Sequence, residues 1–245
     1  PFAQHHYPFE NKDLFEAQFP ADFISEAVDQ TRGWFYSLLA ISTLIFNKAP
    51  FKNVIVLGHV QDENGQKMSK SKGNTIDPVQ IIEKYGCDAL RFTMTSLCTY
   101  GGQDIKISDE RFEYGRNFAN KLWNASRFVR MNLTIDKPEL PDVSELALED
   151  KWILSRLNKL VKSVTDNVEN YEVGVALGEI YSFTWDLFCD WYIEMAKSRT
   201  FEAGTPAALT AKRVLVYVLT NILKLLHPYM PFITEEIYQA LPHPG

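Results

Sequence analysis

The stretch that decides the fold is Gly65-Gln66-Lys67-Met68-Ser69-Lys70-Ser71-Lys72-Gly73-Asn74, called here the lysine loop. Three lysines fall within six residues, interleaved with serines, so several ammonium and hydroxyl groups are presented to one small region. Such a group suits a polyphosphate, because lysines that close on a leaving pyrophosphate stabilise the transition state more than the ground state. The alternative for this composition is a solvated basic surface loop, and the residue order and its setting decide between the two.

The lysine loop lies between a predicted strand and a predicted helix. Before it, residues 53–58 form a β-branched run ending in Gly, typical of a buried strand, and the Asn64-Gly65 pair predicts a tight turn. After it, Asp77 suits a helix N-cap and Pro78 the first helical position. Residues 33–46 predict a buried helix, whereas residues 1–22 show little periodicity and are interpreted as loop and connector.

The pattern changes from Ser108 onward. Helices are predicted from 108 to about 133, and then over 149–170, 174–202, 206–227 and 231–241, after a linker at 134–148. Apolar residues recur at helical spacing, as in Leu215, Val218, Leu219, Ile222 and Leu226. The tryptophans at 123, 152, 185 and 191 are expected in the core. The fold class is therefore α/β followed by all-α, with a domain boundary between residues 108 and 109.

Composition allows a substantial core and indicates no dominant nucleic-acid charge. The 245 residues are 46% hydrophobic with a formal net charge of −6, so any RNA contact must come from local basic patches. The three cysteines are far apart and show no metal-ligand spacing, which favours a reduced, cytoplasmic protein. No apolar run is long enough for a membrane span and no signal peptide is evident. Because the chain begins at Pro1, a fragment of a longer protein is expected.

Lys67-Met68-Ser69-Lys70-Ser71, placed after a strand and before a helix, resembles the signature loop of class I aminoacyl-tRNA synthetases. Residues 1–74 resemble isoleucyl-tRNA synthetase through the segment Glu26-Ala27-Val28-Asp29-Gln30-Thr31-Arg32-Gly33-Trp34-Phe35. Residues 75–245 are more similar to valyl-tRNA synthetase, through the segments 85–92, 116–125, 190–194 and 227–236. Both families share the loop where the two resemblances meet, so natural mosaicism, an engineered chimera and an assembly artefact all stay open.

The resemblance implies the C-terminal half of a Rossmann-like catalytic domain over residues 1–108 and an anticodon-binding helical bundle over 109–245. It also implies ATP-dependent activation of a branched aliphatic amino acid, with Mg²⁺ accompanying ATP, and ligation to the cognate tRNA. Valine is slightly favoured because 171 of 245 residues take that side. Isoleucine is the alternative, favoured by the pocket segment, and a non-catalytic tRNA-binding module is the alternative from another class.

Site residues follow from their positions in the motifs. The resemblance implies that Lys67 and Lys70 are catalytic and that they bind ATP together with Met68, Ser69 and Ser71. It implies that Glu26, Asp29 and Gln30 contact the adenylate, since carboxylates and amides accept hydrogen bonds from ribose hydroxyls and a substrate ammonium. Trp34 would wall the amino-acid pocket, with plain core packing as its alternative. No metal-ligand set is expected.

The His-rich ATP-binding motif of the same class is absent, and His5-His6 does not match it. The chain alone is therefore not expected to activate amino acids at an enzyme-like rate. Two helices carry rows of cations suited to phosphates or simply to solvent: Arg116, Lys121, Arg127 and Arg130, then Lys151, Arg156, Lys159 and Lys162. The expected partners are a valine or isoleucine tRNA, ATP and the amino acid, bound by a monomer without membrane attachment.

Overall fold

The computed structural model describes residues 3–98, 103–133, 139–202 and 204–242, apart from the side chains of Ala3 and Lys70. The chain divides into two compact units. The first combines residues 1–68 with 100–106, and the second combines residues 69–99 with 107–245. Each unit is described by itself.

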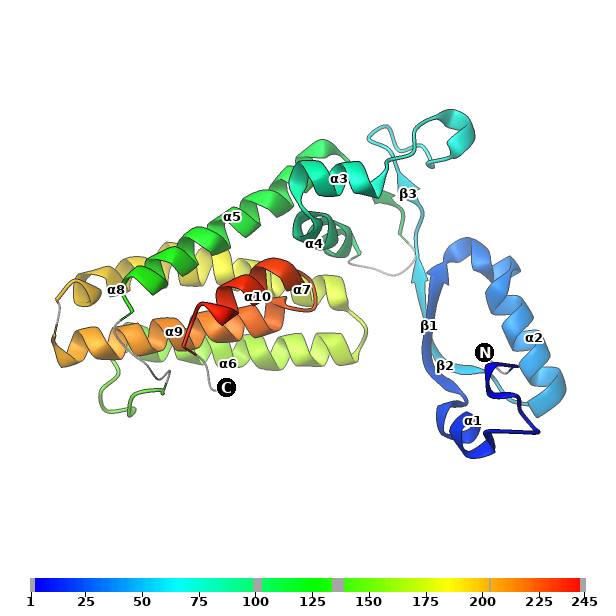
Figure 1. Ribbon diagram of the computed structural model, residues 1–245, viewed down its shortest axis with the longest axis horizontal. Coiled ribbons are helices and arrows are strands. Elements are labelled where there is room, and N and C mark those ends of the chain that lie inside the picture. The colour runs from blue at the N-terminus through cyan, green and yellow to red at the C-terminus, as the bar shows by residue number, and fades with distance from the viewer. Residues whose placement is uncertain (1–2, 99–102, 134–138, 203, 243–245) are drawn as a thin grey trace. The chain divides into compact units, whose positions relative to one another are not determined.

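The first unit is built on a parallel β-α-β arrangement (Figure 1). Strands β1 (Ala21–Ala27) and β2 (Phe51–Leu57) pair in parallel, with Ala21 opposite Phe51 and Ala27 opposite Leu57, and helix α2 (Trp34–Phe46) joins them. Its small core consists of Ile24, Phe35 and Leu38. The remaining elements are η1 (Ala3–His5), α1 (Lys12–Gln18), η2 (Val28–Arg32), and the parallel pair β3 (Val60–Gln61) and β4 (Ile105–Lys106).

The predicted strand at 53–58 and helix at 33–46 are confirmed as β2 and α2. The interpretation of residues 1–22 as loop and connector is wrong in part, because α1 forms and β1 begins at Ala21. Aromatic contacts rather than periodicity hold α1: the Phe15 ring lies 5.0 Å from that of Phe19 and 5.4 Å from that of Phe46. A seven-residue helix with one buried side chain leaves no repeating pattern in the sequence.

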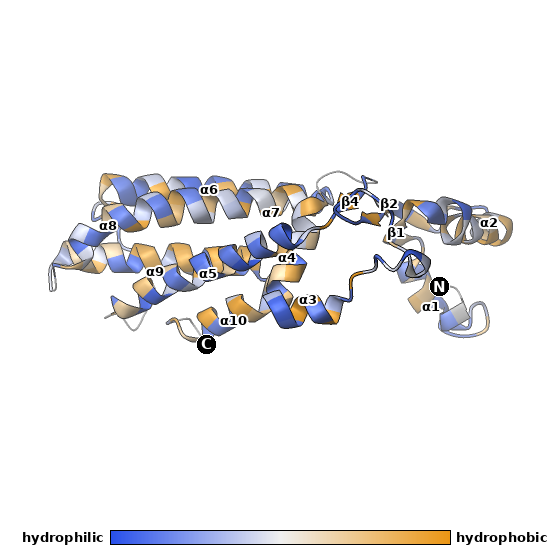
Figure 2. Cartoon of the chain, turned by 90° about the horizontal axis from the view of Figure 1, so that it is seen from above, coloured by the Kyte–Doolittle hydropathy of each residue, from blue (hydrophilic) through white to orange (hydrophobic). Residues whose placement is uncertain are grey.

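The second unit is a helical bundle in which the long helices α6 and α9 lie side by side (Figures 1 and 2). Hydrophobic residues follow one another along these helices at the spacing that buries one face. The elements of this unit are η3 (Lys70–Lys72), α3 (Pro78–Tyr85), α4 (Cys87–Leu97), α5 (Asp109–Met131), α6 (Leu148–Glu169), α7 (Val173–Ser182), η4 (Phe183–Tyr192), α8 (Ile193–Thr200), α9 (Pro206–Leu226) and α10 (Pro231–Gln239).

The predicted apolar face of α9 is confirmed, since all five of its residues are at most 1% exposed. The single helix expected over 174–202 is found as α7, η4 and α8, and η4 is π-helical. The wider turn keeps Phe188 and Tyr192 fully buried. It also explains why Trp191 is 62% exposed, which corrects the core position expected for it. Trp123 is 38% exposed, whereas Trp152 and Trp185 pack against the core.

Two charged side chains of helix α4 bind the backbone at the turn between α9 and α10. Asp88 accepts hydrogen bonds from the backbone N–H groups of Phe232 (3.3 Å) and Ile233 (2.7 Å) in the first turn of α10. Arg91, one turn further along α4, donates to the carbonyl oxygens of Pro228 (2.7 Å) and Tyr229 (3.1 Å), just past the end of α9. Each charge therefore meets the helix end of opposite polarity.

Helix α4 also explains why the compact units do not follow the boundary expected at residue 108. The backbone of α7 approaches α4 so closely that a Cβ on Gly174 would lie 2.5 Å from the carbonyl oxygen of Cys98. Residues 69–99 therefore fold with the helices, although they were expected to belong to the α/β part. The domain boundary expected between residues 108 and 109 stays a prediction, because it concerns evolutionary domains and the compact units are defined by contacts.

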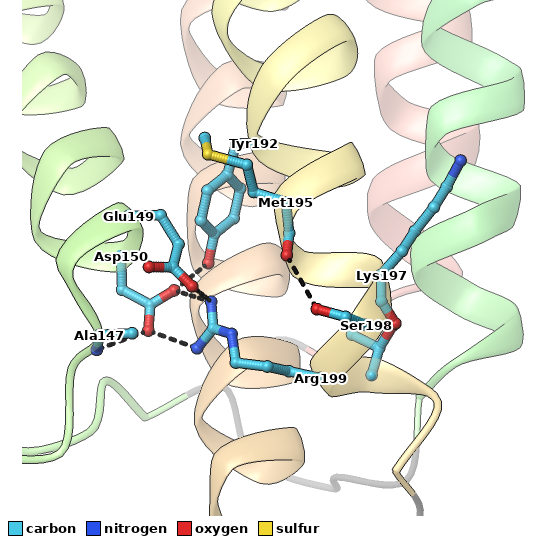
Figure 3. A network of polar contacts seen from close by, with 9 residues as sticks. Ala147, Glu149, Asp150, Tyr192, Met195, Lys197, Ser198 and Arg199 are labelled. Atoms are coloured by element: carbon cyan, nitrogen blue, oxygen red, sulfur yellow. Dashed lines mark hydrogen bonds and ion pairs between the residues drawn. The ribbon is translucent and has the colours of Figure 1, made fainter.

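A buried ion network closes one end of the bundle (Figure 3). The carboxylate of Asp150, which is fully buried, accepts two hydrogen bonds from the Arg199 guanidinium (2.7 and 2.8 Å) and one from the Tyr192 hydroxyl (2.7 Å). It also accepts the backbone N–H of Ala147 at 3.0 Å, where α6 begins. Glu149 lies 3.0 Å from Arg199. The network ties α6, η4 and α8 together, and both carboxylate oxygens of Asp150 are satisfied.

Over the described residues, no helix is both long and apolar enough to cross a membrane. Cys87, Cys98 and Cys189 are free thiols.

Gly174→Ala is expected to lower the free energy of unfolding by about 1–3 kcal/mol, because the added Cβ meets backbone atoms of α4 that cannot move aside. Urea unfolding of this chain, followed by helical circular dichroism, measures the effect. Gly178→Ala in the same helix is the matched control, since a Cβ there meets nothing within 4 Å. It should be neutral or stabilising by up to about 1 kcal/mol. Equal losses in the two variants would contradict the close approach of α7 to α4.

Asp150→Asn is expected to destabilise the chain by about 3–5 kcal/mol at pH 7, since it leaves Arg199 buried beside a neutral group. Burial alone would raise the pKa of Asp150, but hydrogen bonds from Arg199 and Tyr192 outweigh it and the pKa is lowered. A lowered pKa contributes stability above the unfolded value, about 3.9, which is lost as the pH falls through the folded value.

The difference in free energy of unfolding between wild type and Asp150→Asn should therefore become smaller below about pH 4. Urea unfolding at a series of pH values from pH 7 to pH 3 measures this difference. Asp166→Asn is the control, because the Lys162–Asp166 pair is exposed and is worth about 0–1 kcal/mol. A gap that stays constant over this range would show that the charge of Asp150 does not carry the stability.

Candidate active site

The two parallel strands end at the same edge of the sheet, and the candidate residues gather there. β1 ends at Ala27 and is followed by η2, which carries Asp29, while β2 ends at Leu57 and is followed by Gly58 and His59. The crevice outside the carboxyl ends of parallel strands is where α/β folds bind ligands. Asp29 Oδ1 lies 3.6 Å from His59 Nε2, so side chains from both strand ends meet.

His59 was not among the residues expected from the sequence. Asp104 holds it from the other side: Asp104 Oδ1 accepts the His59 backbone N–H at 2.9 Å and lies 3.5 Å from Nδ1 of the ring. Asp104 also accepts a hydrogen bond from the Gln61 side chain. The chain can pass this close only because residue 58 is Gly, since a Cβ there would lie 1.8 Å from the carbonyl oxygen of Gln103. The missed signal was positional, because His59 follows the end of β2 as Asp29 follows that of β1.

Gln30 serves the neighbouring helix. Its side-chain oxygen accepts the Trp34 backbone N–H at 2.8 Å, the first N–H of α2. The helix has no other side-chain cap at this end, because its N-cap residue is Gly33. The expected role of Gln30 in accepting bonds from a ligand is therefore shared with a structural one.

Trp34 lines an apolar cavity of about 170 Å³ and is 39% exposed. The side chains around it are Gln4, His5, Phe15, Gln18, Phe19, Ala21, Ile24, Leu38 and Pro50. The ring is not fully buried, so plain core packing does not describe it, and its place in the amino-acid pocket stays a prediction. Glu26 is exposed near the end of β1, opposite Val56.

The lysine loop passes from the first compact unit to the second between Met68 and Ser69. In the first unit a tight turn shapes it: Asp62 accepts backbone N–H groups of Asn64 (3.0 Å) and Gln66 (2.8 Å) through its side chain. Lys67 then forms a bridge with Gln61, so the loop folds back along β3 with the Lys67 side chain exposed. The predicted turn at Asn64-Gly65 is confirmed.

In the second unit the loop is held by its own side chains. Asn74 accepts the Ser69 backbone N–H at 2.9 Å, and the Ser69 and Ser71 hydroxyls lie 3.2 Å apart. The two hydroxyls therefore present hydrogen-bonding groups together. The side chain of Lys70 lies outside the part of the chain that the structure describes.

The bundle carries a basic groove of about 640 Å³ beside α6. Lys151, Lys159 and Lys162 line it, with Tyr217 of α9 and the apolar residues Leu140 and Val143 among the other walls. Two of the cations of α5 make contacts within the bundle. Lys121 lies 2.6 Å from Asp190 and over the Trp185 ring, and Arg116 lies over the Tyr85 ring.

No group of three or more His, Cys, Asp or Glu side chains is arranged to hold a metal ion among the described residues. The carboxylates of Asp29 and Asp104 both lie near the His59 ring.

Two family models match the chain. Residues 1–108 match the family described as tRNA synthetases class I (I, L, M and V), and residues 150–245 match the anticodon-binding domain of tRNA ligase.

The valine–tRNA ligase of Lactiplantibacillus plantarum is 46% identical over 100% of this chain and 28% of its own length. The isoleucine–tRNA ligase of Clostridium novyi is 45% identical over 98% of this chain and 24% of its own length. Both similarities run across residue 74, so single relatives from either group account for the sequence on both sides of that point. The chain spans about a quarter of the length of these relatives.

Two solved structures share the fold. A ternary complex of Agrobacterium radiobacter K84 agnB2 LeuRS with tRNA and LeuAMS aligns with a TM-score of 0.73 at 21% identity, over 92% of this chain and 27% of that one. Mycobacterium tuberculosis methionyl-tRNA synthetase with methionyl-adenylate aligns with a TM-score of 0.77 at 22% identity, over 96% and 47%. With its catalytic and anticodon-binding segments both matched, the chain belongs to the class I aminoacyl-tRNA synthetases, in the branch of the valine and isoleucine enzymes.

Proposed function

We propose that this chain supplies part of the adenylate-forming site and the anticodon-binding bundle of an enzyme that activates valine with ATP and attaches it to its tRNA. The observation that carries the proposal is the meeting of Asp29 and His59 at the carboxyl ends of β1 and β2, beside the hairpin that carries Lys67. Carboxylates at this edge suit the ribose hydroxyls and the amino group of an aminoacyl-adenylate. The similarity to valine ligases over the whole chain supports the same reading.

In this proposal Lys67 and Lys70 act on the phosphates. When the amino-acid carboxylate attacks the α-phosphate of ATP, charge builds on the leaving pyrophosphate, and ammonium groups stabilise it there. Met68, Ser69 and Ser71 would complete the ATP contacts through backbone groups and hydroxyls. Glu26, Asp29 and Gln30 would bind the adenylate, with Gln30 also fixing the start of α2.

The amino-acid side chain would lie against Trp34. A flat apolar ring suits a branched aliphatic group, and the adjoining cavity is lined mostly by apolar side chains. The alternative substrate is isoleucine, favoured by the segment 26–35 and by the 45% identity to an isoleucine ligase. One methylene is worth about 1–3 kcal/mol in such a pocket, so either enzyme would discriminate poorly by binding alone.

The partners follow from the same proposal. The tRNA would approach the bundle, where the groove lined by Lys151, Lys159 and Lys162 offers cations to its phosphates. Mg²⁺ would arrive with ATP, bound by phosphate oxygens. The described residues hold no carboxylate cluster for it, so we derive no step from the metal. A monomer in the cytoplasm completes the proposal.

A non-catalytic tRNA-binding module is the alternative from another class. The absence of the His-rich motif from this chain favours it for the chain in isolation. The lysine loop and Asp29 favour the enzyme.

The protein encoded by the complete gene is expected to charge valine onto valine tRNA. The measurement is a charging assay with both amino acids and both tRNAs, because pyrophosphate exchange alone would accept either amino acid. Charging of isoleucine tRNA alone would overturn the valine assignment, and binding of tRNA without charging would favour the non-catalytic module. Residues 1–245 alone are expected to show no exchange at a rate near that of the complete protein, and such exchange would refute that expectation.

Lys67→Ala in the complete protein is expected to lower kcat for pyrophosphate exchange about 10²–10³-fold with little change in KM for ATP, because its contact strengthens in the transition state. Lys72→Ala is the matched control in the same loop, with an expected change of less than about threefold. A rise in KM at unchanged kcat would assign Lys67 to ground-state binding instead.

A further inference from the structure

We propose that His59 is a positioning residue of the candidate active site, whose imidazole holds the carboxylate of Asp29 in place and is itself braced by Asp104. The inference rests on the proposed function and deepens it, since it adds a residue that neither the motifs nor the family resemblance singles out.

The first argument is the position of the ring between two carboxylates. Nε2 of His59 lies 3.6 Å from Asp29 Oδ1, and Nδ1 lies 3.5 Å from Asp104 Oδ1. Both nitrogens of one ring therefore point at acidic groups from different segments, η2 and the segment before β4. These distances exceed hydrogen-bond length, and contacts in catalytic sites commonly tighten only when the substrate binds.

The second argument is the burial of Nε2. Although the side chain as a whole is 24% exposed, this nitrogen is covered and has no hydrogen-bond partner within the described structure. Leaving a buried polar atom unsatisfied costs about 1–3 kcal/mol. A shift of well under 1 Å by Asp29 would satisfy it, so the ring favours one position of that carboxylate over others.

The third argument is the rigidity of the support. Asp104 binds the backbone of His59 as well as facing its ring, and it also binds Gln61. The His59 carbonyl oxygen in turn accepts the Ile105 N–H at 2.8 Å. A ring whose backbone is held at its N–H by Asp104 and at its carbonyl oxygen by Ile105 can orient another group with little loss of its own freedom.

The consequence for Asp29 is that its two carboxylate oxygens have different partners. If Oδ1 is held by His59, Oδ2 can accept a hydrogen bond from a ribose hydroxyl or an ammonium group. His59 directly precedes β3, whose Gln61 forms a bridge with Lys67. The same short segment, residues 59–61, would therefore set the places of one adenylate contact and one phosphate contact.

The two sides of the ring can be tested separately. In His59→Gln the amide nitrogen stands near the place of Nε2 and faces Asp29, whereas in His59→Asn it stands near the place of Nδ1 and faces Asp104. If His59 positions Asp29, the Gln variant keeps the function and the Asn variant loses it. If His59 only stabilises β3 through Asp104, the order reverses and the melting temperature changes rather than the kinetics.

The experiment measures kcat and KM for pyrophosphate exchange by the complete protein, together with its melting temperature. His59→Asn is expected to lower kcat/KM about tenfold to a hundredfold at an unchanged melting temperature, with His59→Gln within about threefold of wild type. His6→Asn, an exposed histidine paired with Glu10, is the matched control and should have no effect. Combining His59→Asn with Asp29→Asn should add little to the loss from Asp29→Asn alone.

Suppose that the wild type shows pyrophosphate exchange. If His59→Asn then shows the same rate, or if the losses in the double variant are additive, the role of His59 is overturned and the proposed function stands. Equal losses in the Asn and Gln variants with a lowered melting temperature would also overturn it. No exchange by the wild type with any branched aliphatic amino acid would overturn the proposed function and this inference together.

Discussion

The structure depends on the pair of opposite charges that α4 presents to the corner between α9 and α10. Asp88 caps the first turn of α10, where the N-cap residue, Met230, has no acceptor of its own. Arg91 satisfies the carbonyl oxygens that follow α9. Because both charges sit on one helix, α4 binds the end of α9 and the start of α10 together. The segment just after the lysine loop is thereby committed to the bundle.

The candidate site follows a different constraint, the geometry of parallel strands. One crossover helix is enough to bring the ends of β1 and β2 to the same edge, and the residues that follow each strand meet without further design. The proposed phosphate chemistry needs no covalent partner from the protein. A small site is therefore enough, because its residues only have to orient hydrogen bonds and charges.

Much of this was predictable from the sequence, and the exceptions have physical reasons. The helices of the bundle and the face of α9 are visible because burial repeats along them every three or four residues. The strand β2 and the turn at Asn64-Gly65 are visible because they rest on local preferences. Helix α1, which is held by ring contacts across distant residues, was not visible, and neither was the wide turn that exposes Trp191.

The roles expected for Glu26, Asp29, Gln30 and Trp34 came from the family motif. His59 was missed because its importance lies in contacts with Asp29 and Asp104, which are 30 and 45 residues away in the chain. Contacts of that kind leave no spacing rule in one sequence. Gln30 shows the converse, since its motif position suggested a ligand contact and the structure adds a local bond to Trp34.

The π-helical segment η4 makes the chain sensitive to length at this point. Ten consecutive residues in a wider turn bring Tyr192 to Asp150. Removing one residue from 183–192 would change the direction in which every later side chain leaves the helix. Tyr192 would leave the carboxylate, and Arg199 would leave with it. Single-residue deletions should therefore be far rarer here among related chains than in the neighbouring α-helices, whereas substitutions on the exposed side, as at Trp191, remain open to change.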